Sequence, residues 1–221
     1  MPTLLDTGSR YKTCCGKDIC SGCIHAVRER DGNIGLCPFC RIPTSTSDKE
    51  DTDRLRKRVE LGDAMAIYTL GGDYARGVMG FKQNYNKALE LLHRAGELGS
   101  VEAYYNIGTF HFNGIGVEID EKKAKHYYEL AAMKGCAAAR YALGILEQRE
   151  GNMDRAVKHW MIAAQGGKAN SLNMIQQLYT NGDATKDDYT AALQGYQEYL
   201  IEIKSAGRDE AAAFSDEFKY Y

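Results

Sequence analysis

Six of the seven cysteines fall within a short N-terminal segment, and their spacing is typical of a metal-binding module. They form two C-x-x-C knuckles and one adjacent pair: Cys20 and Cys23, Cys37 and Cys40, and Cys14 and Cys15. A knuckle brings two thiolates onto one tetrahedral zinc ion, which takes four ligands. Six thiolates are therefore enough for one complete zinc site and half of a second. The remaining cysteine, Cys136, stands among alanines and is expected to be a small buried residue.

The sequence CCGKDICSGC, followed later by CPFCR, resembles a RING finger of the all-cysteine subclass. In that subclass a cysteine pair precedes a glycine, and the last knuckle reads CP-x-CR. The resemblance implies that one Zn²⁺ site is complete, with the ligands Cys14, Cys15, Cys37 and Cys40. It implies that Cys20 and Cys23 form half of a second site, whose first C-x-x-C is missing from residues 1–13. His25 is a candidate third ligand of that site, with a surface histidine as the alternative.

The same resemblance implies a docking surface for a ubiquitin-conjugating enzyme. RING fingers use apolar residues after the second knuckle ligand and the proline of the last knuckle, which here are Ile24 or Val27 and Pro38. Arg41 follows the last ligand directly, where active RING fingers often carry a basic residue that holds the ubiquitin-loaded enzyme closed. The alternative for Arg41 is a solvated arginine at the edge of a domain.

Residues 1–44 are assigned to this incomplete finger, and residues 45–62 to a linker and a capping helix. The stretch IPTSTSDKEDTD has no apolar periodicity, and Ser47 or Asp48 is a candidate helix cap. Acidic residues precede basic residues along this helix, as the helix dipole favours. The dipole explains the basic run, with a nuclear import signal as the alternative.

From residue 63 onward the sequence repeats with a period near 36 residues. Recurrent small residues mark the first helix of each unit: Ala66, Ala103 and Ala139, then Gly71, Gly108 and Gly144. In the second helix, two small residues and two large ones share one face with a glycine: Ala88, Ala95, Leu91, Leu92 and Gly96. A glycine inside a helix costs about 1 kcal/mol relative to alanine. Glycine nevertheless recurs at one position of the first helices, which predicts close packing between helices at that point.

These units resemble Sel-1-like repeats, a helical-hairpin family related to tetratricopeptide repeats. Residues 106–135 carry the family's G-x-G-V, D-x-x-K-A and AA-x-x-G motifs. The resemblance implies an all-α solenoid of helical hairpins preceded by the small zinc module, because one hairpin cannot bury its apolar face alone. The expected repeat units are 63–100, 101–136, 137–168 and 169–205. A C-terminal tail, 206–221, follows them.

The repeats are expected to bind a protein partner or substrate on a concave surface. Tyr68, Tyr105 and Tyr141 recur at one position of the first helices. A ladder of tyrosines can grip a partner, or it can set the angle between neighbouring repeats. Periodic aromatic residues are core residues first, which favours the structural role.

Composition and charge argue against several other functions. A net charge of −2 and a pI near 6.2 give no electrostatic case for binding nucleic acid or a membrane surface. No apolar run approaches the roughly 20 residues that span a bilayer. The opening residues lack the apolar region of a secretory signal, so a cytoplasmic protein is expected, with the nucleus as an alternative. No Ser–His–Asp or Cys–His constellation is apparent.

Two functions from different classes remain. In the first, the protein is a RING-type ubiquitin ligase or ligase adaptor whose finger recruits a ubiquitin-conjugating enzyme and whose repeats bind a substrate. Such a protein acts as a transferase only by proximity, without covalent chemistry of its own. In the second, the finger is degenerate and the chain is a non-catalytic protein-interaction scaffold.

Overall fold

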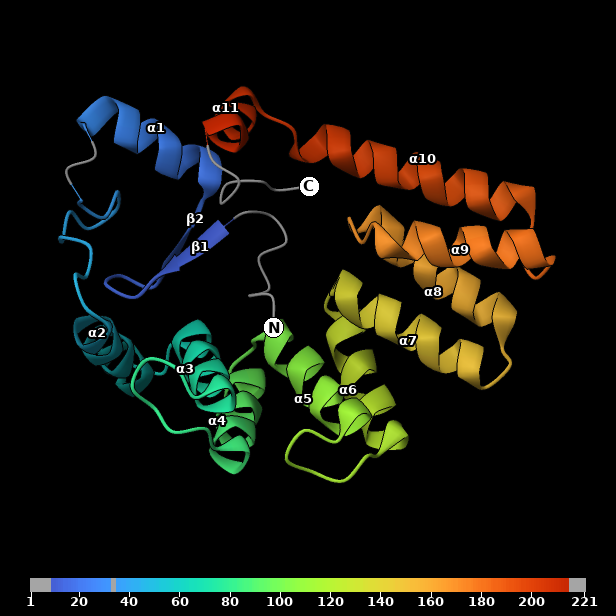
Figure 1. Cartoon of the computed structure of the whole chain (residues 1–221), viewed down its shortest axis with the longest axis horizontal. Coiled ribbons are helices and arrows are strands. Elements are labelled where there is room, and N and C mark those ends of the chain that lie inside the picture. The colour runs from blue at the N-terminus through green and yellow to red at the C-terminus, as the bar shows by residue number, and fades with distance from the viewer. Residues whose placement is uncertain (1–8, 33–34, 215–221) are drawn as a thin grey trace. The chain divides into compact units, whose positions relative to one another are not determined.

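A computed structural model describes residues 9–32 and 35–214 (Figure 1). Within these residues the chain forms eleven helices and one two-stranded sheet. This confirms the predicted all-α solenoid class with a small N-terminal cysteine-rich module. The chain divides into two units, residues 1–100 with 203–221 and residues 101–202, each with its own internal contacts. None of the described helices is long and apolar enough to cross a membrane.

The first unit begins with a β-hairpin that leads into a helix (Figure 1). Strands β1 (Ser9–Lys12) and β2 (Lys17–Cys20) pair antiparallel. The turn between them holds the cysteine pair and Gly16, whose φ of +70° favours glycine. Helix α1 (Ser21–Asp31) follows at once, and the Cys20 side chain caps its first turn. The hairpin and α1 therefore place the first four cysteines on closely connected elements.

Three helices of the first unit follow the finger: α2 (Asp48–Glu60), α3 (Ala64–Arg76) and α4 (Tyr85–Glu97). The residue before each helix accepts hydrogen bonds from amides of its first turn: Ser47, Asp63 and Asn84. Such caps satisfy backbone donors that the helix itself leaves unpaired. They explain where these helices begin, and Ser47 is one of the two caps predicted for the first of them.

The last helix of the first unit, α11 (Ala206–Phe214), lies against α1. The sequence predicts only a C-terminal tail over residues 206–221, where the structure has this helix. Ala211 of α11 is fully buried in a cluster with Ile19 and Ile24. The residue that α11 contributes to this cluster is an alanine, which carries little hydrophobic signal in the sequence.

The second unit consists of helices that pack as antiparallel neighbours: α5 (Val101–Asn113), α6 (Glu121–Met133), α7 (Ala137–Arg149), α8 (Met153–Gln165), α9 (Asn170–Asn181) and α10 (Lys186–Ile203). The pairs α5 with α6 and α7 with α8 make the most extensive contacts. Two apolar clusters fill this unit, and Trp160 is fully buried in one of them. Its indole N–H donates to the carbonyl of Tyr141 at 3.1 Å, which satisfies its polar atom inside the core.

The recurrent glycines lie where the two helices of a hairpin approach most closely. A Cβ on Gly108 would stand 2.7 Å from the ring of Tyr128, and one on Gly144 would overlap the indole of Trp160. A Cβ on Gly71 would lie 3.3 Å from the carbonyl oxygen of Ala88. The structure thus confirms the close packing that the glycine register predicts.

Candidate metal centre

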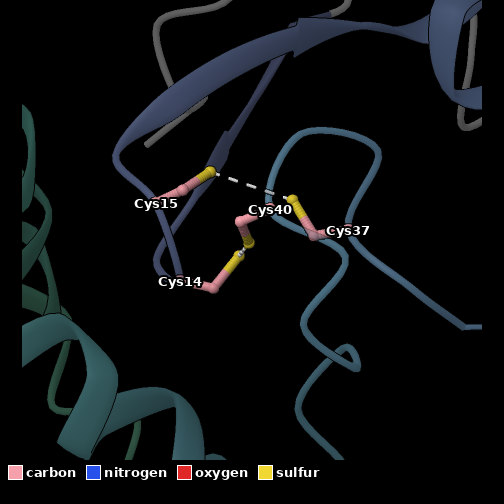
Figure 2. Close-up of side chains that lie close together, drawn as sticks. All are labelled: Cys14, Cys15, Cys37 and Cys40. Carbon is pink, nitrogen blue, oxygen red and sulfur yellow. Dashed lines mark hydrogen bonds between the residues drawn. The ribbon is translucent and has the colours of Figure 1, made fainter.

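Four cysteine side chains converge between the β-hairpin turn and the loop of the last knuckle (Figure 2). They are Cys14, Cys15, Cys37 and Cys40, and their sulfur atoms all lie within 4.8 Å of one another. The Cys15 and Cys37 sulfurs are 3.8 Å apart, and those of Cys14 and Cys40 are 3.5 Å apart. These are the four residues to which the sequence analysis assigned the complete site.

The separations fit a tetrahedral zinc ion. With a Zn–S distance of about 2.3 Å, neighbouring sulfurs of a tetrahedral site lie about 3.8 Å apart. The Cys15–Cys37 and Cys14–Cys40 sulfur pairs are within 0.3 Å of that edge. A set of four thiolates with no water or carboxylate among them is typical of a structural zinc site. We therefore take these four residues as the ones that would hold zinc.

Local backbone hydrogen bonds hold the last knuckle in its loop. The Cys37 N–H donates to the carbonyl of Ile42 at 2.8 Å, and the Arg41 N–H donates to the carbonyl of Cys37 at 3.0 Å. Arg41 has a φ of +61°, which is uncommon for a residue with a side chain. An isolated antiparallel bridge between Leu36 and Pro43 closes the loop. These backbone hydrogen bonds hold together the loop that carries both sulfurs of the knuckle.

The thiols differ in acidity. Burial raises the pKa of Cys37, but hydrogen bonds from the backbone N–H groups of Cys40 and Phe39 outweigh it and bring the pKa to about 7. Burial and the neighbouring sulfurs raise the pKa of Cys14 and of Cys15 above the ordinary value. A bound divalent cation reverses this balance, because metal-bound thiols are deprotonated. Without a cation, the group favours protonated thiols at Cys14 and Cys15.

The second predicted site is not assembled to the same degree. Cys20 and Cys23 lie at the start of α1, where the Cys23 N–H donates to the Cys20 sulfur at 3.4 Å. His25 is half-buried on the same helix. Within residues 9–32 and 35–214, the group of four cysteines is the only set of three or more ligand atoms close enough to hold a metal. The structure therefore does not bring His25 to these cysteines as a third ligand.

Arg208 of α11 lies beside the thiol pair of α1. Burial raises the pKa of Cys20, but hydrogen bonds from the Cys23 backbone and from Arg208 lower it overall. The charge of Arg208 also acts on Cys23. Sequence reasoning could not place Arg208 here, because nothing local links it to a helix so far away along the chain.

The residues predicted to dock a conjugating enzyme have different surroundings. Ile24 is only 7% exposed and packs against Ala211. Pro38 is half-buried, and Arg41 is exposed. Sequence reasoning missed Phe39 and Ile42, whose exposed fractions are 45% and 42%. Their signal was an apolar residue directly before the last ligand, Cys40, and another directly after Arg41, in the stretch CPFCRI.

A polar network joins the cysteine hairpin to the helices that follow. The Tyr11 hydroxyl donates to Asp63 at 2.8 Å, and Arg58 donates to the same carboxylate oxygen at 2.7 Å. The Thr13 hydroxyl donates to Asp51 at 2.8 Å. Burial alone would raise the pKa of Asp63, but the hydrogen bonds from Tyr11 and Arg58 lower it below its ordinary value. The finger is therefore anchored to α2 and α3.

The profile of the Sel1 repeat family matches residues 64–100 and 101–136. The chain contains Sel1 repeats. The first matched Sel1 repeat is the hairpin of α3 and α4, and the second is the hairpin of α5 and α6. Helices α7 to α10 continue the same alternation beyond the matched residues.

Several proteins with curated descriptions are similar to the repeat region. A putative Sel1-like repeat-containing protein of Acanthamoeba polyphaga mimivirus is 31% identical over 96 residues, which cover 41% of this chain and 18% of that protein. HRD3B of Arabidopsis thaliana, described as an ERAD-associated E3 ubiquitin-protein ligase component, is 26% identical over 51% of this chain and 18% of its own length. Chitin synthase regulatory factor 4 of Schizosaccharomyces pombe is 28% identical over 66% of this chain and 24% of its own. The chain thus spans about a fifth to a quarter of the length of these relatives.

Solved structures support the Sel1 fold. A Sel1 repeat protein from Oxalobacter formigenes superposes with a TM-score of 0.63 at 25% identity, covering 82% of this chain and 72% of that one. A protective antigen of uropathogenic Escherichia coli with an SLR fold gives a TM-score of 0.61 at 24% identity, over 84% of this chain and 38% of that one. The second likeness shows the fold alone.

The recurrent tyrosines of the Sel1 repeats are half-buried. The Tyr105 ring lies 5.7 Å from the ring of Tyr128, and Tyr141 packs against the cluster that contains Trp160. These contacts support the structural role for Tyr105 and Tyr141. Tyr68 occupies the corresponding position in α3 and is also half-buried.

Proposed function

We propose that this protein is a ubiquitin-ligase component in which the cysteine finger recruits a ubiquitin-conjugating enzyme and the Sel1 repeats hold a protein substrate. The observation that carries the proposal is the group of four cysteines directly beside exposed apolar residues. Phe39 and Ile42 flank the ligand Cys40 and are both more than a third exposed. A structural zinc ion at the four thiolates would fix this loop, so that its apolar side chains form a stable docking surface.

The finger would act by holding the two reactants close together. Zinc supplies structural rigidity when bound, and no reactive group of the chain takes part in the transfer. Docking through Phe39, Ile42 and Pro38 would bring the ubiquitin thioester close to a lysine of a protein held by the repeats. Holding two reactants in place raises their effective concentration, which accelerates the transfer without new chemistry. The network around Asp63 supports this arrangement, because it fixes the finger to the first repeat helices.

The relatives favour the adaptor form of this function. HRD3B and HRD3A of Arabidopsis thaliana are both described as components of an E3 ubiquitin-protein ligase. The similarity to them covers 51% of this chain in each case. A role in holding protein partners for ubiquitylation follows naturally for repeats of this type.

A second function is favoured by the surroundings of Ile24. This residue belongs to the docking surface that the RING resemblance implies, yet it is buried against α11. A finger whose Ile24 does not contact a conjugating enzyme is consistent with a protein-interaction scaffold in which zinc serves only to stabilise the fold. The two functions differ in whether a conjugating enzyme binds at all.

The test is a ubiquitylation assay on the full chain with a panel of purified ubiquitin-conjugating enzymes. Ile42→Asp places a charge in the docking surface, and we expect it to reduce self-ubiquitylation at least about tenfold, since a buried charge without a partner is strongly unfavourable. Ile119→Asp is the matched control, because Ile119 is also an exposed isoleucine and lies in a repeat loop. Equal activity of the two variants would refute docking at this loop. No activity with any enzyme, from a protein that binds zinc, would favour the scaffold.

A further inference from the structure

Helix α11 covers the face of α1 that carries Ile24. Ile19, Ile24 and Ala211 form one buried cluster, in which Ala211 has no exposed surface. Of all the element pairs far apart in the sequence, α1 and α11 make the most contacts within the described residues. A residue expected to meet a partner is thus covered by the chain itself.

The backbones of the two helices approach each other closely at Gly22. A Cβ at this position would lie 2.9 Å from the carbonyl carbon of Gly207 and 2.9 Å from the backbone nitrogen of Arg208. Side chains do not pack that closely, so any residue other than glycine would push α11 away. The glycine inside the Cys20–Cys23 knuckle therefore permits this contact.

Arg208 adds a polar interaction at the same place. Its guanidinium group hydrogen-bonds to Cys20 and donates to the carbonyl of Ile203 at 3.0 Å. The start of α11 is thus held by a charged group, and its middle is held by Ala211. The interaction with Cys20 ends on the residue before α1, and Ala211 contacts the cluster of Ile24 in α1 and Ile19 in β2.

The contact is small enough to be released. Among the side chains that the structure describes, the buried apolar cluster contains three, and the one supplied by α11 is an alanine. The burial of Ala211 itself removes only a modest apolar area from water. A partner that buries Ile24 in a larger interface would compete with α11 effectively, because binding shifts a conformational equilibrium by the difference in affinity for its two states.

We propose that α11 is an autoinhibitory segment that keeps Ile24 covered, so that a ubiquitin-conjugating enzyme reaches the α1 face only when α11 leaves. This inference rests on the proposed function, which names the enzyme as the partner of the finger. Phe39 and Ile42 are exposed while α11 is in place. The covered protein would therefore bind the enzyme weakly, and the open protein would bind it about tenfold more tightly, through one additional apolar contact.

The test uses the full chain with one substitution on each face of α11. Ala211→Asp places a carboxylate in the buried cluster and should release α11. Ala213→Asp makes the same chemical change at an exposed position of the same helix. Gly22→Ala offers a second route, because it pushes α11 away from the other side. Each protein is examined by amide hydrogen exchange in α1 and by its affinity for the purified panel of conjugating enzymes.

Ala211→Asp and Gly22→Ala are expected to speed exchange in α1 and to raise affinity, while Ala213→Asp leaves both unchanged. Faster exchange with a measurable but unaltered affinity would overturn the inference and leave docking through Phe39 and Ile42 intact. Unchanged exchange in both releasing variants would show that α11 does not cover α1, whatever the enzyme does. Faster exchange without binding in any protein would overturn the proposed function, and the inference with it.

Discussion

Single residues decide whether the cysteine group can work as a metal site. Cys15 and Cys37 are 22 positions apart in the chain, and their sulfurs are 3.8 Å apart in space. Burial raises the pKa of Cys14 and Cys15, so these two thiols are poorly suited to negative charge on their own, whereas the pKa of Cys37 is lowered to about 7. A cation at the centre would compensate the charge of four thiolates. The geometry of the group and the raised pKa of Cys14 and Cys15 are both compatible with a cation at its centre.

At this scale we predict that Cys37→Ser lowers the zinc content from about one ion per chain to well below half that value, because a tetrahedral structural site needs all four ligands. Cys136→Ser is the control, since Cys136 precedes α7 in the second unit and is not part of the group. Elemental analysis against protein concentration measures the content. Equal zinc in the two variants would contradict the assignment, and two ions in the unchanged protein would mean that Cys20 and Cys23 also bind metal.

At the scale of elements, the hairpins depend on glycines that leave room for a large side chain on the opposite helix. Gly144 of α7 faces Trp160 of α8, and Gly108 of α5 faces Tyr128 of α6. The buried aromatic ring fills the space that a side chain would take. Helix propensity alone would favour alanine at these positions, so the packing requirement outweighs it.

We predict that Gly144→Ala lowers the free energy of unfolding by about 1–3 kcal/mol, because the added methyl group displaces a fully buried indole. Gly72→Ala is the matched control. Its Cβ would meet only the flexible end of Arg76 at 3.4 Å, and the substitution should be neutral or stabilise by up to about 1 kcal/mol. Urea denaturation followed by circular dichroism measures both. Similar effects of the two substitutions would mean that helix propensity, and not packing against Trp160, governs this site.

At the scale of the whole molecule, two apolar clusters lie in the second unit, and the cluster of Ile19, Ile24 and Ala211 lies in the first, to which the metal centre also belongs. Tyr11 and Thr13 tie the hairpin of that unit to Asp63 and Asp51. Asp63 also caps α3, so one carboxylate serves both the finger and the first Sel1 repeat. A change that orders the finger should therefore also order the first turn of α3, where the repeats start.

Removal of zinc with a chelator is expected to speed amide exchange in β1, β2, the knuckle loop and the first turn of α3. Exchange in residues 101–202 should stay the same, because no part of the metal centre lies there. Hydrogen-exchange mass spectrometry with and without the chelator tests this on the full chain. A loss of protection confined to the finger would show that the Asp63 network does not couple the finger to α3. Faster exchange throughout residues 101–202 would contradict the expectation that the metal centre affects only its own unit.

The sequence by itself determined the repeat architecture and the four cysteines that meet. The repeats follow from small and large residues at helical spacing and from caps at helix starts, whereas the set of four cysteines was implied by the resemblance of the two cysteine segments to a RING finger. The helix α11, the burial of Ile24 and the Asp63 network were decided only by tertiary structure. Ala211 and Arg208 meet α1 across almost the whole chain, and a contact at that separation leaves no local pattern. An alanine-rich face carries too little hydrophobic signal to show which surface it will cover, and only the fold supplies that information.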